Sequence, residues 1–343
     1  MPTKRMWCIC SRFASVTESA AIAAAEWMGR GDALAASLAA RQAMAADLAE
    51  MPLRARVVAG RGGDPSCDTL SVGSEVGLEV GPWATASPDG GPWSDEPDPW
   101  ALAVDPLQAP NSLARGADGA LAMIAAGPLG SLMPVPEMYM QKLIVPSEAA
   151  EAIDLDALVG ENMKGVAAAL GRRLQDLSVV VLDRPRHEDL IAQIRASGAS
   201  VRLVSDGDVS AGLAVASRDV GVDMCIGIGG STEGILTAAA LRCLGGEMQA
   251  RFWPVSRHQV ELVRAAGIED IEARLTTREM AGDGVLFVAT AVTGGRFLKP
   301  VAHRADGIHT ETLVLCSRCR SVRKIHTTRQ PENGGPQVTL GAR

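Results

Sequence analysis

Short apolar runs alternate with amphipathic stretches through the second half of the chain, from Ser178 onward. Strands and helices in this regular order are typical of a parallel sheet whose crossover connections are helical. The predicted strands are 179–182, 201–204 and 224–228, and the predicted helices are 188–196, 211–216 and 233–244. Two later apolar runs, 285–290 and 312–316, predict further strands.

The first half of the chain has a mixed pattern that predicts an α+β arrangement. Its alanine-rich stretch favours two helices, 17–28 and about 33–48, because Gly29–Gly31 interrupts the pattern and Asp32 is placed to cap the second helix. Apolar runs at 56–59, 101–104 and 120–126 predict strands, the second of which is expected to stop at Asp105–Pro106. We therefore predict the α/β class, with an α+β part over 1–147, an α/β part over 148–329 and an unstructured tail over 330–343.

The stretch 81–100 contains five prolines among glycines and acidic residues. Proline removes the backbone donor that a helix interior or a central strand needs, so this stretch cannot be either. We expect an exposed acidic loop. The alternative is that Trp83, Trp93 and Trp100 fasten it onto a partner subunit.

Composition narrows the classes of function. The 343 residues are 47% hydrophobic and only 3% aromatic, and 33 basic against 40 acidic side chains give a net charge of −7. A protein of this sign gains nothing from counterion release on nucleic acid or on an anionic membrane, so we expect neither partner. No apolar run is long enough for a membrane span or a signal peptide, and the seven cysteines are an odd number. These features predict a cytoplasmic enzyme of small metabolites with reduced thiols.

Charged residues follow each of the three predicted parallel strands. The strand ends deliver Asp183–Arg186, Ser205–Asp208 and Gly229–Glu233, and ligands of open α/β sheets bind at such ends. Two arginines on either side of a proline suit a phosphate, whose oxygens match the guanidinium fork. The carboxylates of an Asp-Gly-Asp turn suit sugar hydroxyls or a metal ion. A glycine turn that opens a helix can cradle phosphate with its free N–H groups.

At these loops the sequence resembles the class II fructose-1,6-bisphosphatases, which are relatives of the inositol monophosphatase-like sugar phosphatases. The resemblance covers nearly the whole chain and follows the family's order. It is carried by VTESAAIAAAEWMGRGD (16–32), AVDPL (103–107), PEMYMQKLIV (136–145), DRPRHEDLIAQIRASGA (183–199), SDGDV (205–209), IGIGGSTEGILTAAALRCLGGEMQAR (226–251) and TETL (310–313). The family implies a layered α/β sugar-phosphatase fold, with the metal site in the first part and substrate contacts in the second.

The resemblance also implies an activity and a substrate site. The family hydrolyses the 1-phosphate of fructose 1,6-bisphosphate, so the partner would be a small phosphorylated sugar, and its members form homo-oligomers. The arginines would hold the phosphate that is not cleaved, and the Asp-Gly-Asp turn would hold the sugar. The family's substrate residues match Tyr139, Arg184, Pro185, Arg186, Asp206, Gly207, Asp208 and Gly230.

The metal site of the family, which takes Mg²⁺ or Mn²⁺, is only partly matched. Its acidic ligands match Asp32, Asp105 and Glu233, whereas Arg61 and Gln108 stand where the family has two glutamates. The two changes remove three units of negative charge, and a guanidinium within a few ångströms of a divalent cation repels it by several kcal/mol. We therefore expect fewer ions than the family norm. Arg61 and Gln108 become candidates for binding substrate instead.

Two further positions bear on the attacking water. Pro110 stands at the family's threonine, whose hydroxyl is implicated in positioning that water, and proline offers neither a hydroxyl nor an N–H. Pro65 stands at the acid that follows the glycine-rich turn, and Asp64 next to it is a candidate catalytic replacement.

These departures leave three interpretations. The first is an active phosphatase that runs on one metal held by Asp32, Asp105 and Glu233, with Arg61 as a fixed cation against the phosphoryl oxygens. The second is an impaired paralogue that binds a sugar bisphosphate as a sensor or regulatory subunit. The third is an active enzyme with a changed substrate.

The spacing Cys316-Ser-Arg-Cys319 is that of half a zinc site, and Cys8-Ile-Cys10 could supply the other half. A closed tetrahedral site needs all four thiolates to converge. Because Cys316 ends a predicted core strand and the resemblance implies no structural zinc, we expect the two pairs not to form such a site.

Overall fold

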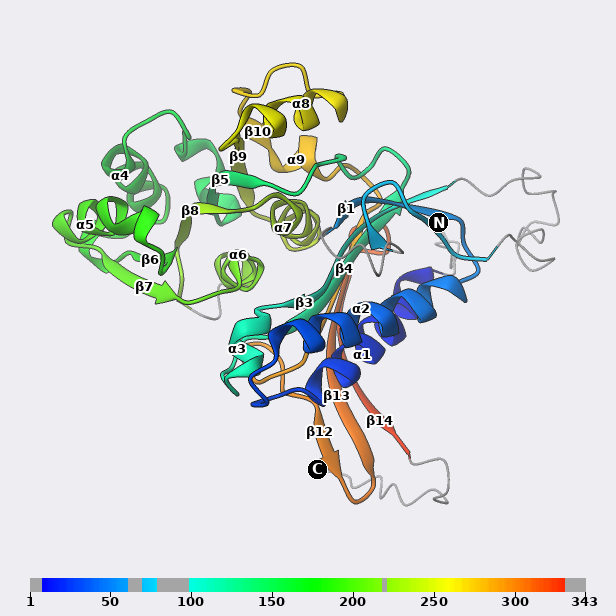
Figure 1. The fold of residues 1–343 in the computed structure, drawn as a ribbon. Helices are drawn as coiled ribbons and strands as arrows, with labels where there is room; N and C mark the ends of the chain where they lie inside the picture. The colour runs from blue at the N-terminus through cyan, green and yellow to red at the C-terminus, as the bar shows by residue number, and fades with distance from the viewer. Residues whose placement is uncertain (1–7, 61–69, 79–98, 218–220, 331–343) are drawn as a thin grey trace, which may run out of the picture.

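Two β-sheets and three layers of helices make up the described part of the chain, as the computed structural model shows (Figure 1). The structure describes residues 8–60, 70–78, 99–217 and 221–330. Helices α1 and α2 cover the outer face of the first sheet, α6 and α7 lie between the two sheets, and α4 and α5 cover the outer face of the second sheet. The layered α/β fold predicted from the sequence is thus confirmed.

The first sheet has eight strands, in the order β12-β13-β11-β4-β3-β1-β2, with β14 paired to β13. Strands β1 and β3 are parallel, and the other pairs are antiparallel. The strands are β1 (Ala55–Gly60), β2 (Glu75–Val76), β3 (Trp100–Gln108), β4 (Leu121–Pro128), β11 (Leu286–Ala291), β12 (Ala302–Arg304), β13 (Gly307–Cys316) and β14 (Ser321–Arg329). Since β11 to β14 return to this sheet, its strands come from both ends of the chain.

Helices α1 (Arg12–Ala25) and α2 (Ala33–Ala49) pack on the first sheet through small side chains. Six of their alanines are buried against aliphatic residues of β3, β4 and β11 in one apolar cluster: Ala14, Ala20, Ala21, Ala24, Ala36 and Ala40. A short 3₁₀ helix, η1 (Ile9–Ser11), precedes α1. The predicted cap is confirmed, because the Asp32 carboxylate accepts a hydrogen bond of 2.9 Å from the Ala35 N–H at the start of α2. Alanine lets helix and sheet approach closely, which explains how a core with few aromatics is filled.

The second sheet has six strands, in the order β10-β9-β5-β8-β6-β7. Strands β6, β7 and β8 are parallel, as predicted, whereas β5 lies antiparallel between β8 and β9. The strands are β5 (Tyr139–Val145), β6 (Ser178–Leu182), β7 (Ser200–Val204), β8 (Met224–Gly230), β9 (Glu247–Trp253) and β10 (Leu275–Thr276). The helices are α3 (Pro110–Ala114), α4 (Val159–Ala169), α5 (Glu188–Ala196), α6 (Asp208–Ser217), α7 (Ser231–Leu244), α8 (Arg257–Ala265) and α9 (Thr277–Met280), with 3₁₀ helices η4 (Ser147–Ala152), η5 (Leu174–Asp176) and η6 (Pro185–His187).

Strand β3 differs from its prediction. The expected stop at Asp105–Pro106 is wrong, since the strand runs on to Gln108. The register with β4 shifts between Asp105 and Gln108, and this irregularity takes up the proline, which has no N–H to give to a regular ladder. The extension places Gln108 at the carboxyl end of β3.

Three other expectations fare differently. The division of the chain at residue 147 stays a prediction, although β11 to β14 belong to the first sheet and β5 to the second. The acidic stretch 81–98 and the tail from 331 lie outside the described residues.

Trp100 opens β3, with its ring centroid 6.2 Å from that of Phe13, so it packs within its own chain. None of the helices in the described segments has the length and apolar character to cross a membrane.

Candidate active site

The carboxyl ends of β6, β7 and β8 meet at one edge of the second sheet, because the three strands are parallel neighbours. The segments predicted to bind ligand lie there: Asp183–Arg186 after β6, Ser205–Asp208 after β7, and Gly229–Glu233, which spans the end of β8 and the first turn of α7. In Figure 1 these ends lead into α5, α6 and α7. The parallel pairing of these strands therefore brings the three segments together.

Arg186 and Tyr139 form one wall of the candidate site. The guanidinium carbon of Arg186 lies 4.8 Å from the centre of the Tyr139 ring, in cation–π contact. The same guanidinium donates to the Ile228 carbonyl at 2.7 Å, which fixes it against β8. Both side chains remain exposed, and Tyr139 is 42% exposed. A positive charge held on an aromatic face and open to solvent suits a phosphate group.

A buried ion pair anchors the Asp-Gly-Asp turn. The Lys142 ammonium, on β5, lies 2.5 Å from an Asp208 carboxylate oxygen and donates to the Gly230 carbonyl at 2.7 Å. Lys142 is 4% exposed and Asp208 is 8% exposed. A Cβ at Gly229 would come within 2.1 Å of the Asp208 carboxylate, so this approach requires a glycine. One lysine thus joins two of the three ligand loops.

His187 joins the remaining loop to β8. Its Nδ1–H donates to the Leu182 carbonyl at 2.8 Å, and its Nε2 accepts from the Ile228 N–H at 2.8 Å. Burial lowers the pKa of His187 below its ordinary value of 6.5, and the charges of Arg186 and Arg184 lower this pKa further, although the Leu182 carbonyl opposes them. His187 is 1% exposed, so both hydrogen bonds lie in the interior.

We expect His187→Phe to destabilise the protein by about 1–3 kcal/mol, because two buried backbone groups lose their partner. The variant should also raise KM for a phosphorylated substrate, since Arg186 is held by the neighbouring Ile228 carbonyl. The unfolded chain protonates this histidine more readily than the folded one, so wild-type stability should fall as the pH drops below about 6.5. Urea unfolding at pH 7.5 and at pH 5.5 measures this. A fall of equal size in His187→Phe would contradict the assignment.

Gln108 connects the first sheet to this edge of the second. A Cβ at Gly207 would lie 3.2 Å from the Gln108 Oε1, so the amide sits beside the Asp-Gly-Asp turn. Gln108 is 1% exposed, and neither its Oε1 nor its Nε2 has a hydrogen-bond partner among the described residues. A buried amide in this state is costly unless a ligand completes it. Its position therefore supports a binding role.

The three candidate metal ligands come from separate elements. Asp105 on β3 is fully buried, Glu233 in the first turn of α7 is 7% exposed, and Asp32 is exposed and caps α2. The Glu233 carboxylate lies 2.0 Å from where a Cβ at Gly230 would be, so it folds back over the glycine that precedes α7. In the described segments these carboxylates do not form a group close enough to share an ion, so their metal role stays a prediction. Arg61 and Asp64 lie outside the described residues.

The predicted substrate residues that the structure describes are brought to one edge of the second sheet, and their role in binding stays a prediction. Lys142 was missed as a functional residue. Its signal was a single lysine inside the apolar run of β5, since a buried lysine needs a partner.

Comparison with known proteins decides the family. A family model described as "Bacterial fructose-1,6-bisphosphatase, glpX-encoded" matches residues 8–329. The chain belongs to the class 2 fructose-1,6-bisphosphatase family. It is 38% identical over 338 residues to a D-fructose 1,6-bisphosphatase class 2/sedoheptulose 1,7-bisphosphatase of Synechococcus sp. (strain JA-2-3B'a(2-13)), covering 94% of this chain and 95% of the relative.

Relatives in other bacteria agree with this family. The chain is 35% identical over 344 residues to fructose-1,6-bisphosphatase 1 class 2 of Escherichia coli (strain K12), covering 96% of this chain and 97% of that protein. It is 34% identical over 328 residues to fructose-1,6-bisphosphatase class 2 of Haemophilus influenzae, covering 92% and 94%. The resemblance inferred from the motifs is thus confirmed.

Proposed function

We propose that this member of the class 2 fructose-1,6-bisphosphatase family binds a sugar bisphosphate and hydrolyses its 1-phosphate with low or conditional turnover. The observation that carries the proposal is the convergence of Arg186, Tyr139 and Asp208 at one strand edge, in a chain that matches the family over residues 8–329. Fructose 1,6-bisphosphate and sedoheptulose 1,7-bisphosphate, which appear in the names of relatives, are the substrates we propose. We also propose that the protein is a homo-oligomer.

The substrate assignment rests on charge and exposure. Arg184 and Arg186 would hold the phosphate that is not cleaved, since both lie at the strand edge. Arg186 is exposed, and its hydrogen bond to the Ile228 carbonyl holds it in place. The Asp206–Asp208 turn would take the sugar hydroxyls, because its position is fixed by Lys142. Gln108, buried beside this turn, would give its amide to the sugar or to a phosphoryl oxygen.

The candidate metal ligands suit divalent ions, but fewer ions than the family's site takes. The Asp105, Glu233 and Asp32 carboxylates and the Gln108 amide oxygen are hard donors of the kind Mg²⁺ and Mn²⁺ prefer. However, one Asp32 oxygen already caps α2, and the amide of Gln108 carries no charge. Because the three carboxylates do not converge in the described structure, we propose that they hold at most one ion rather than two. When bound, such an ion neutralises phosphoryl charge and activates water.

The second candidate is a binding protein without useful turnover. Gln108 favours it, since a neutral side chain occupies a buried position next to the substrate turn. Arg61 and Pro110 favour it as well, because a guanidinium is poorly suited to binding a metal ion and proline has neither a hydroxyl nor an N–H to position a water. The two candidates share the bisphosphate site and differ in the rate of hydrolysis.

Thermal shift and phosphate release together test the proposal. We expect fructose 1,6-bisphosphate at about a hundred times its Kd to raise Tm by about 3 °C or more. Phosphate release with Mn²⁺ or Mg²⁺ should be slow. In Arg184→Met/Arg186→Met the shift should disappear, while Arg173→Met, which breaks an exposed ion pair elsewhere, should retain it. An unchanged Tm with either bisphosphate contradicts the site, and fast hydrolysis contradicts the impaired metal centre.

A further inference from the structure

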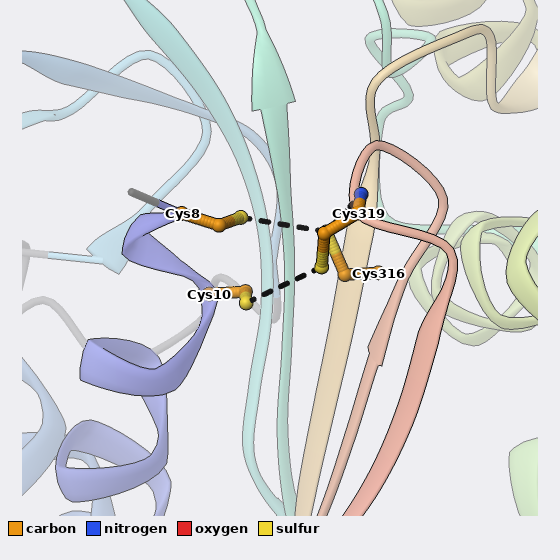
Figure 2. A group of neighbouring side chains, drawn as sticks. All are labelled: Cys8, Cys10, Cys316 and Cys319. Carbon is orange, nitrogen blue, oxygen red and sulfur yellow. Dashed lines mark hydrogen bonds between the residues drawn. The ribbon is translucent and has the colours of Figure 1, made fainter. Parts of the chain in front are cut away.

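Four cysteines from the two ends of the chain converge on one point. Cys8 and Cys10 lie at η1, Cys316 ends β13, and Cys319 lies in the turn that leads to β14. Their Sγ atoms all lie within 4.8 Å of one another, and no other such group of ligands occurs in the described segments. Figure 2 shows the two pairs facing each other across the end of the sheet. This convergence disagrees with the expectation from the sequence that the two pairs form no zinc site.

Two of the sulfur separations match those of a tetrahedral metal site. The Sγ atoms of Cys8 and Cys316 are 3.6 Å apart, and those of Cys10 and Cys319 are 3.9 Å apart. Zinc–thiolate bonds of about 2.3 Å place the sulfurs of a tetrahedron about 3.8 Å apart. A disulfide needs about 2.05 Å, and all four residues are free cysteines. The pairs are thus spaced for an ion between them.

The surroundings of the cluster suit thiolates that carry negative charge. Arg323, on β14, donates to the Cys10 Sγ at 2.9 Å and to the Cys319 Sγ at 3.9 Å. The Cys319 N–H points at the Cys316 Sγ, 3.5 Å away. Backbone and cationic donors around the sulfurs hold the ligands in place and offset the charge of a four-thiolate site. Cys10 and Cys316 are buried at the border of the apolar core, which keeps water away.

We propose that Cys8, Cys10, Cys316 and Cys319 bind one structural Zn²⁺. Four thiolates fill the tetrahedron and leave no position for water or substrate, so the ion has a structural role. Cys8 and Cys316 are 308 residues apart in the sequence. The ion therefore fastens the segment before α1 to the β13–β14 hairpin, and zinc binding contributes to folding stability.

Metal content of the purified full chain tests this proposal independently of phosphatase activity. After dialysis against EDTA to strip weakly held ions, elemental analysis should find one zinc per chain. The Cys8→Ser/Cys10→Ser variant should contain none, and its Tm should fall by about 5 °C or more. Cys243→Ala, which removes a half-buried thiol outside the cluster, should keep the zinc.

Cobalt substitution keeps the test valid even if the double variant folds poorly. Wild-type protein freed of zinc and loaded with Co²⁺ should show thiolate-to-cobalt charge transfer and the visible bands of tetrahedral cobalt. The assignment would be overturned if wild type contained no zinc, or if it contained iron instead of zinc. It would also be overturned if the double variant retained zinc. Peptide mapping that finds Cys8–Cys316 and Cys10–Cys319 disulfides would overturn it as well.

Discussion

The triple variant Arg61→Glu/Gln108→Glu/Pro110→Thr is expected to release phosphate from fructose 1,6-bisphosphate about 100-fold faster than wild type, or more. The variant returns three units of negative charge to the metal site and a hydroxyl beside it. Removal of one well-placed electrostatic group from an active site costs about 10²–10³ in kcat, and its return should recover a similar factor. Steady-state phosphate release with saturating Mn²⁺ measures the change.

Single and double variants separate the contributions. Gln108→Glu alone adds one buried carboxylate, so we expect a small gain that depends on Mn²⁺, whereas Arg61→Glu/Gln108→Glu should give most of the increase. Pro110→Thr alone should gain little, because the ions would still be missing. A triple variant that folds, binds the bisphosphate and remains as slow as wild type would refute the charge explanation.

Lys142→Met should have the largest effect on the folded protein. It leaves the Asp208 carboxylate buried without its ammonium partner, and breaking a buried ion pair in this way costs about 3–5 kcal/mol. It also removes the donor to the Gly230 carbonyl, so the loops after β7 and β8 lose their common anchor. We expect a large fall in the free energy of unfolding and a loss of the bisphosphate-induced Tm shift. Urea unfolding and thermal shift measure the two effects.

A second substitution distinguishes anchoring from general instability. Lys142→Met/Asp208→Leu removes both charges, so it should regain much of the stability, because apolar replacements of a buried pair are often neutral. It should not regain the bisphosphate-induced shift, since the Asp-Gly-Asp turn is incomplete. Arg173→Met serves as the exposed control and should leave unfolding almost unchanged. Recovery of ligand binding in the double variant would exclude Asp208 from the substrate site.

Local signals in the sequence predicted much of the fold. Helix α5 begins at Glu188 and ends at Ala196 as predicted, and α2 begins at Ala33 behind its Asp32 cap. The three parallel strands also fall within two residues of their predicted ends. Caps, glycine breaks and apolar runs act within a few residues of themselves, so a single sequence reveals them.

Contacts between distant segments could not be predicted in this way. The extension of β3 through Pro106 depends on the irregular register with β4, which no local pattern records. His187 and Lys142 owe their roles to partners on β8 and α6, brought close only by the order of the strands. The four cysteines show the same limit, since the spacing within each pair was visible but their convergence follows from the packing of η1 against β13.

The number of Mn²⁺ ions bound per chain shows whether the metal site has lost capacity. Electron paramagnetic resonance measures free Mn²⁺ during a titration, and the difference from the total gives bound Mn²⁺. Zinc held by the cysteines does not enter this count. We predict at most one Mn²⁺ in wild type and two in Arg61→Glu/Gln108→Glu/Pro110→Thr. Two Mn²⁺ ions bound by wild type would contradict this prediction.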